Sequence, residues 1–245
     1  RGPKDKINLF YGLITFSVSI WSVALYFFRI LQDPKLIILT GKIIYIFAAA
    51  IALFFLYFTL IFPKKIFSKI FFNIIIAGGF IFILFLIIWP DALIKDYALQ
   101  KGVNSLIWSW AYILYALYIM AYFGLGFLIL IFNYKKSSGI EKLQIRYVFW
   151  GTFISSFLAI ITNLFLVWLG DFRFNWLGPL FTMVMVILIA YAIVKHHLMN
   201  IKVIATEIFA GSIALILLIN FLTSTTATEW LIRGFLLIVG TIFSY

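Results

Sequence analysis

The sequence has no cysteine, two histidines and few charged residues, which make up 11% of the chain. The absence of cysteine excludes disulfide bonds, thiolate metal sites and a cysteine nucleophile. The scarcity of charge excludes an ordinary soluble domain, because hydrophobic residues make up 65% of the chain. These deficits point to a protein that lies mostly within a lipid bilayer.

Ionisable side chains are also missing from the middle of every long apolar run. Proton relays, voltage sensors and ion-coupled transporters need such groups within the membrane. A retinal Schiff base would need a lysine there. No glycine-rich phosphate loop, metal-spaced cluster or catalytic triad is present either, so we expect no cofactor, no metal ion and no catalytic residue in these residues.

The apolar runs themselves predict an all-α fold, a polytopic transmembrane helix bundle with short loops. A transmembrane β-barrel would instead show alternating segments of about ten residues. The five prolines lie at or near the predicted helix ends. Eight hydrophobic segments are predicted: Ile7–Ile30, Lys42–Phe62, Ile66–Trp89, Ser105–Phe132, Ile145–Leu169, Trp176–Val194, Ile201–Leu222 and Trp230–Tyr245.

The stretch from residue 175 to residue 207 shows most clearly how such a helix is delimited. Its uncharged run with the lead-in from Trp176 covers about 19 residues, or roughly 28 Å at 1.5 Å per residue, which matches the bilayer core. Pro179 suits the first helical turn, where its missing N–H would have no partner. Trp176 suits one membrane interface and the basic residues 195–197 suit the other.

The basic loop residues predict the orientation of the bundle. One side carries twelve basic residues: Arg1, Lys4, Lys6, Lys64, Lys65, Lys69, Lys135, Lys136, Lys142, Arg146, Lys195 and Lys202. The opposite side carries seven: Arg29, Lys35, Lys42, Lys95, Lys101, Arg173 and Arg233. The positive-inside rule makes the first side cytoplasmic, together with the N-terminus. The net charge of +11 therefore lies in loops, where we expect it to attract anionic lipids rather than nucleic acid.

Tryptophans gather at the predicted outer ends of the helices. Six of the eight do so: Trp89, Trp108, Trp110, Trp168, Trp176 and Trp230. One interpretation is an aromatic belt at the lipid headgroups. The other is an outward-facing pocket for an apolar or amphipathic ligand, for which the candidate binding residues are Trp108, Trp110, Trp168 and Trp176.

Small and polar residues recur at helical spacing within three segments: Gly12, Thr15, Ser19 and Ser22; Ala48 and Ala52; and Gly151, Ser155, Ala159, Thr162 and Asn163. In lipid, such residues let helix backbones approach one another. We therefore expect these stripes to face the inside of the bundle. Asn163 and Asn220 are expected either to form interhelical hydrogen bonds or to line a polar cavity.

Several short motifs resemble the seven-transmembrane N-terminal sensor region of bacterial histidine kinases. They are LGPLFT at 177–182, IAYAIVKH at 189–196, Leu198-Met199, Ile201-Lys202, PKDKIN at 3–8, Phe16-Ser17 and Trp21-Ser22. His197 and Asn200 depart from the family, which more often has Arg and Asp there. The resemblance implies that residues 1–199 form the sensor region without its first helix. Residues 200–245 would add further helices leading to a cytoplasmic output domain, and the chain would be a fragment.

The resemblance further implies a signal-input module of a two-component sensor kinase in the inner membrane of a bacterium. The module would dimerise through the output domain. The residues expected to transmit the signal are Gly178, Pro179, Tyr191, Lys195, His196 and Asn200. Two alternatives stay open: a small-solute or lipid transporter, which predicts discontinuous helices around a midplane site, and a passive membrane anchor for another output domain.

Overall fold

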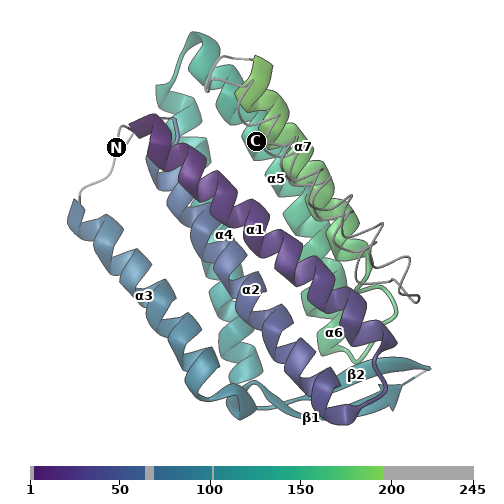
Figure 1. The fold of residues 1–245 in the computed structure, drawn as a ribbon. Coiled ribbons are helices and arrows are strands. Elements are labelled where there is room, and N and C mark those ends of the chain that lie inside the picture. Colours follow the sequence, from purple (N-terminus) through teal and green to yellow (C-terminus); the bar gives the residue numbers. More distant parts are fainter. Residues whose placement is uncertain (1–2, 64–68, 101, 196–245) are drawn as a thin grey trace, which may run out of the picture. The chain divides into compact units, whose positions relative to one another are not determined.

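The computed structural model describes residues 3–63, 69–100 and 102–195 (Figure 1). They belong to one compact unit, Arg1–His196. Its elements, in chain order, are α1 (Pro3–Ile30), α2 (Pro34–Ile61), α3 (Lys69–Ile88), the 3-10 turn η1 (Pro90–Ala92), β1 (Ile94–Gln100), β2 (Val103–Trp108), α4 (Ala111–Lys136), α5 (Gly139–Ile160), the π-helical segment η2 (Ile161–Phe165), α6 (Leu166–Trp168) and α7 (Leu177–Lys195).

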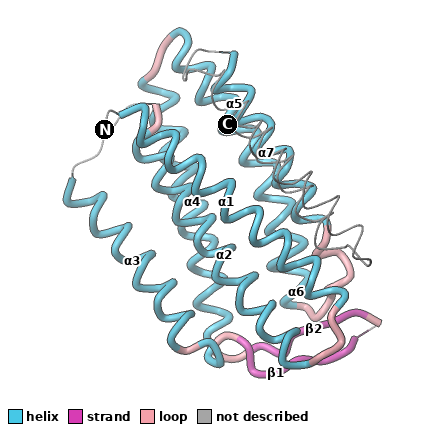
Figure 2. Tube along the Cα trace, in the orientation of Figure 1, coloured by secondary structure: helices cyan, strands magenta, loops and turns pink. Residues whose placement is uncertain are grey.

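The predicted helical bundle is confirmed for this part of the chain (Figure 2). Within the described residues, four helices are long and apolar enough to cross a membrane: Lys6–Ile30, Pro34–Ile61, Ala111–Lys136 and Gly139–Trp168. A shorter apolar helix covers Asn73–Ile88. The predicted count of eight is not tested, because the segments Ile201–Leu222 and Trp230–Tyr245 lie outside the described residues.

Helix α2 forms the centre of the bundle and is the most buried of the four long helices. Helix α1 packs along it on one side, α4 on another, and α3 lies at the edge, while α5 pairs with α7. Successive helices run in opposite directions, so the ends of α4 and α7 lie together in Figure 1, away from the hairpin. Lys135 and Lys195 therefore lie at the same end of the bundle, as the loop charges predict.

A β-hairpin, formed by β1 and β2, replaces the predicted start of the fourth helix and corrects the all-α prediction. The two strands pair antiparallel, with Tyr97 opposite Leu106. Gly102 has a φ of +75°, which allows the tight connection between the strands. The prediction was wrong for Ser105–Trp108 because a short apolar run is equally compatible with a strand. The side chain of Leu106 rests on Gly41 of α2, where an added Cβ would lie 2.9 Å from Leu106 Cδ1.

Helix α2 begins at Pro34, well before the predicted Lys42. Asp33 caps it, because its Oδ1 accepts a hydrogen bond of 2.8 Å from the Lys35 N–H, and Pro34 occupies the first turn. The prediction followed hydropathy alone and overlooked this Asp-Pro start signal.

Two buried asparagines satisfy the carbonyl ends of the first two helices. Asn104 Nδ2 of the hairpin donates to the carbonyls of Phe28 and Leu31, at 2.7 and 2.8 Å. Asn133 Nδ2 of α4 donates to the Phe62 carbonyl at the end of α2, at 2.9 Å. Helix-terminal carbonyls have no intrahelical partner, and leaving them bare in an apolar environment is costly. Side chains from distant elements therefore close both helices.

The small-residue stripe on α5 faces inward, as predicted. Gly151 and Ser155 are buried, and an added Cβ on Gly151 would lie 2.6 Å from Leu188 Cβ of α7. Ala52 on α2 is fully buried as well. These positions let the helix backbones approach closely.

The corresponding prediction for α1 was wrong. Gly12 and Ser19 are exposed, and nothing lies within 4 Å of a Cβ added at Gly12. The hydroxyl groups of Thr15, Ser19 and Ser22 donate to carbonyls four residues earlier in the same helix. The buried face of α1 is instead the large-residue stripe Ile7, Tyr11, Ile14, Val18, Trp21, Leu25 and Phe28. A hydroxyl that bonds its own backbone needs no neighbouring helix, so spacing alone misidentified the face.

Candidate functional site: a cavity inside the helix bundle

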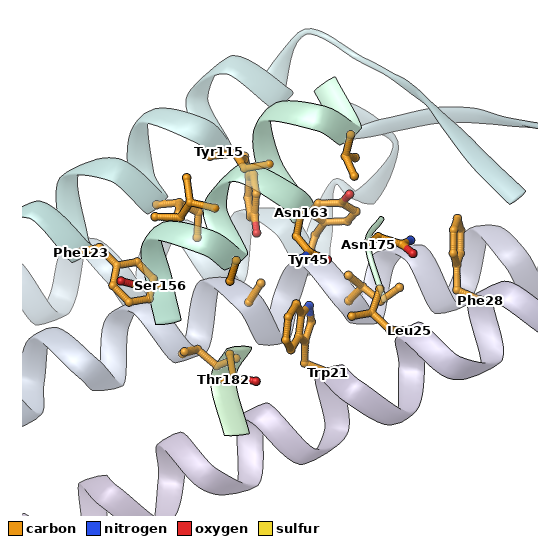
Figure 3. Close-up of a pocket in the computed structure, with 18 of the residues that line it drawn as sticks. Trp21, Leu25, Phe28, Tyr45, Tyr115, Phe123, Ser156, Asn163, Asn175 and Thr182 are labelled. Atoms are coloured by element: carbon orange, nitrogen blue, oxygen red, sulfur yellow. The ribbon is translucent and has the colours of Figure 1, made fainter. Parts of the chain in front are cut away.

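A cavity lies between α1, α2, α4, the α5–η2 segment and α7 (Figure 3). Its volume is about 80 Å³, whereas a single water molecule requires about 10–15 Å³. Large apolar side chains form most of its wall: Leu25, Phe28, Ile44, Ile51, Leu106, Ile119, Phe123, Ile160, Leu164, Val167, Phe172 and Met185. The cavity is therefore large enough for a group of several heavy atoms and is mainly apolar.

A few polar groups interrupt this wall. Tyr45 of α2 and Tyr115 of α4 are both more than nine-tenths buried. Figure 3 shows the Tyr115 hydroxyl directed toward the middle of the cavity. Neither hydroxyl forms a hydrogen bond with any residue that the structure describes, although both belong to the wall. The side chain of Asn163 lies in the wall opposite α1, where its Nδ2 donates to Thr162 Oγ1 at 2.8 Å.

The other tyrosines on this face of α4 differ, because their hydroxyls bind backbone carbonyls of neighbouring helices. Tyr118 donates to the Ala49 carbonyl of α2 at 3.2 Å, and Tyr122 donates to the Ile75 carbonyl of α3 at 2.8 Å. Tyr118 and Tyr122 thus join α4 to α2 and α3, whereas Tyr115 on the same helix presents its hydroxyl to the cavity.

The π-helical segment η2 determines where Asn163 lies. Here the Leu166 N–H donates to the Ile161 carbonyl, five residues back, which corrects the prediction of an uninterrupted fifth helix. Such segments leave carbonyls poorly paired, and they occur often at functional sites. Tyr112 Oη donates to the Leu164 carbonyl at 2.9 Å, and Trp108 Nε1 donates to the Val167 carbonyl at 3.3 Å. Aromatic side chains from β2 and α4 therefore hold this segment in place.

The first turn of α7 rests directly on this segment. A Cβ added to Gly178 would collide with Asn163 Nδ2 and would come 2.5 Å from the Trp21 ring of α1. Pro179 follows in the first turn, as predicted, and Thr182 Oγ1 donates to the carbonyls of Gly178 and Pro179. Only glycine allows α7, η2 and α1 to approach this closely.

A group of polar contacts lies beside the cavity, at the hairpin end of α1. Arg29 Nη1 at the end of α1 donates to Asn175 Oδ1 at 3.2 Å and to the Arg173 carbonyl at 3.4 Å. Arg173 in turn pairs with Asp171 at 2.7 Å, and this hydrogen bond raises the pKa of the guanidinium. The α6–α7 loop is thereby tied to the end of α1.

The four tryptophans predicted to bind a ligand do not form one pocket. Trp108 stacks on Phe172 and lies next to Tyr45, behind the cavity wall. Trp110 borders a separate shallow groove of about 510 Å³ beside Phe85 and Trp89. Trp168 and Trp176 are exposed. Ligand binding by these four residues stays a prediction.

Trp21 was missed as a cavity residue, although only 4% of its surface is exposed. One sequence signal could have identified it. Trp21 lies in the middle of its segment, away from the predicted interfaces, and shares a helical face with Leu25 and Phe28.

The residues predicted to transmit a signal lie along α7 as far as it is described. Gly178 and Pro179 occupy its first turn, whereas Tyr191 and Lys195 belong to its last turns. His196 and Asn200 lie outside the described residues, as does Asn220. The structure therefore gives a physical role to Gly178 and leaves the other assignments as predictions.

A model of the family described as the N-terminal 7TM region of histidine kinase matches residues 4–202. The chain belongs to this family. The resemblance predicted from the short motifs is thereby confirmed. No curated protein and no solved structure matches the chain.

Membership identifies the bundle as a histidine kinase 7TM region and as a multi-pass membrane protein. The transporter alternative predicted discontinuous helices. Segment η2 changes the hydrogen-bond spacing but stays helical, and the described cavity wall contains no charged side chain. Nothing in the described part of the 7TM region supports transport.

Proposed function

We propose that this 7TM region is the sensory input module of a two-component histidine kinase. A stimulus would shift the packing of α7 against α1 and η2, and α7 would carry the shift toward the kinase output. This needs only two helix packings that differ by a few kcal/mol. The kinase activity itself would lie outside these residues.

One observation carries the proposal beyond the family match: Gly178 of α7 touches both Asn163 and Trp21, which also line the cavity. A displacement of Asn163 or Trp21 would therefore displace the first turn of α7, because packed interiors do not deform freely. The last described helix is mechanically joined to the candidate site.

We further propose that the module lies in the inner membrane of a bacterium, with its N-terminus in the cytoplasm. The clustering of Lys135, Lys136, Lys142 and Lys195 at one end supports this orientation. These residues would bind anionic lipid headgroups. Dimerisation through the output domain is proposed as well.

The test is the autophosphorylation rate of the full-length protein in lipid nanodiscs. Replacing both Trp108 and Trp176 by Leu alters the hairpin side of the bundle, so we expect the rate to change by about five-fold, the effect of roughly 1 kcal/mol between two states. Trp150→Leu is the control, because Trp150 is exposed on α5 and away from that side. If the double variant, the control and the wild type have equal rates, the passive-anchor alternative is favoured.

A further inference from the structure

We propose that the cavity binds a neutral amphipathic small molecule, with an unbranched apolar chain and one hydroxyl or carbonyl group. The inference deepens the proposed function by naming a class of ligand. It rests on that function only for the consequence of binding, because binding can be measured without the kinase.

The apolar character of the ligand follows from the wall. Apolar side chains from α1, α2, α4, α5, η2, α6 and α7 surround the cavity, including Phe28, Ile51, Phe123 and Met185. An apolar group that leaves water for such a site gains roughly 25 cal/mol per Å² of buried surface. The volume of about 80 Å³ suits a chain of several carbon atoms rather than a large ring system.

The neutrality of the ligand follows from the absence of compensating charge. The described residues of the wall include no Asp, Glu, Lys, Arg or His. Arg29 does not line the cavity; it is an exposed residue at the end of α1, where it donates to Asn175 and to the Arg173 carbonyl. A charged ligand would lose its hydration and gain no partner of opposite sign, which costs several kcal/mol.

The polar end of the ligand follows from the unused hydroxyl groups. Tyr45 and Tyr115 are buried, line the cavity and lack a hydrogen-bond partner among the described residues. Buried polar groups in proteins are normally paired. Each phenol can donate to a carbonyl or hydroxyl oxygen of the ligand, and it can also accept from a hydroxyl. Other polar wall residues already have partners: Ser156 and Thr182 donate to carbonyls of their own helices, Asn163 donates to Thr162, and Asn175 accepts from Arg29.

Occupancy would then affect α7 directly. Thr182 and Met185 of α7 belong to the wall, and Asn163 contacts Gly178 at the start of the same helix. A ligand that fills the cavity favours one position of α7 relative to α1 and η2, to the extent that it binds more tightly to the protein in that arrangement.

Photolabelling tests this inference on the full-length protein in nanodiscs. The probe is an eight-carbon alcohol that carries a diazirine, and mass spectrometry locates the modified residues. We expect labels on cavity residues such as Tyr115 and Met185, and competition by excess 1-octanol. A probe of equal length without the hydroxyl should label these residues about three- to ten-fold less, the effect of one or two hydrogen bonds. Labels confined to lipid-facing residues such as Ile113, or equal labelling by both probes, would overturn the inference.

Two variants sharpen the test. Ala159→Phe places a ring in the cavity, so it should abolish the cavity labels, whereas Ile113→Phe on the exposed face of α4 should not. If Ala159→Phe fails to fold, the pair Tyr45→Phe and Tyr115→Phe decides, because it keeps the shape and should remove the preference for the alcohol. A preference that persists in this pair would contradict the inference.

The autophosphorylation rate separates the two proposals. Cavity labelling by the alcohol without any change of rate on adding 1-octanol would count against the sensory function and leave the binding site standing. A change of the autophosphorylation rate in the variants, while the cavity stays unlabelled, would count against the binding site and leave the sensory function standing.

Discussion

Asn163 and Gly178 are in contact across two helices, with no room between them for a side chain on the glycine. Asn163 belongs to the π-helical segment that follows α5, and Gly178 lies in the first turn of α7. The Trp21 ring closes the same junction from α1. Three helices thus meet at one backbone position, beside the cavity.

Gly178→Ala should destabilise the bundle by about 1–3 kcal/mol, because the added methyl group must push α7 away from Asn163 and Trp21. Thermal unfolding of the purified protein in detergent measures this loss. Gly124→Ala is the matched control, since nothing lies within 4 Å of its added Cβ. It should be neutral, or it should stabilise by up to about 1 kcal/mol through helix propensity. Equal unfolding temperatures for the two variants would contradict the close junction.

Asn104→Ala and Asn133→Ala should each lower the free energy of unfolding by about 1–3 kcal/mol, because helix-end carbonyls lose a donor that another element supplies. Asp at either position should not restore stability, since an ionised carboxylate cannot donate. The exposed Asn73 of α3 provides the control, for which an Ala substitution should have little effect. If Asp at either position restored the free energy of unfolding, the stabilising role of the asparagine amide donors would be contradicted.

Tyr112→Phe should loosen the π-helical segment by removing the hydrogen bond to the Leu164 carbonyl. Interhelical hydrogen bonds in membrane proteins average about 0.6 kcal/mol, so we expect roughly three-fold faster hydrogen exchange over residues 161–168. Tyr26→Phe on the exposed face of α1 is the control. Unchanged exchange in the Tyr112 variant would mean that this hydroxyl does not hold the segment.

Much of the fold was predictable because the bilayer demands long apolar helices. Hydropathy located the helices, and loop charge placed Lys135 and Lys195 at the same end. The hairpin was missed because strands of six or seven residues resemble the start of a helix. The start of α2 was misplaced because Asp33 and Pro34 signal it through capping rather than through hydropathy.

The cavity could not be predicted from the sequence, because it depends on which faces meet. Small residues on α1 suggested an inward stripe, yet Trp21 and Leu25 form the buried face. A π-helical hydrogen-bond pattern has no clear sequence signature, so the position of Asn163 in the wall was one of two open alternatives. Gly178 was selected by family resemblance, and only the structure shows what it touches.

The proposed orientation can be tested with single cysteines, since the chain has none of its own. Ser138→Cys lies between α4 and α5 at the lysine-rich end, and Gln32→Cys lies between α1 and α2 at the hairpin end. A membrane-impermeant maleimide added to intact cells should label only Gln32→Cys. In inverted vesicles it should label only Ser138→Cys. The opposite result would reverse the orientation, and labelling of both from one side would exclude a bundle that spans the membrane.

The proposed signalling role of α7 is tested most directly by measuring the position of α7 relative to α1 and the autophosphorylation rate in the same samples. Spin labels on Val23→Cys of α1 and Leu180→Cys of α7 report the separation of these helices at exposed positions of the full-length protein in nanodiscs. In the Gly178→Ala background, we expect a shifted distance distribution together with about a five-fold change in the autophosphorylation rate, whereas Gly124→Ala should change neither. A displaced α7 with an unaltered rate would contradict the claim that this helix carries the signal.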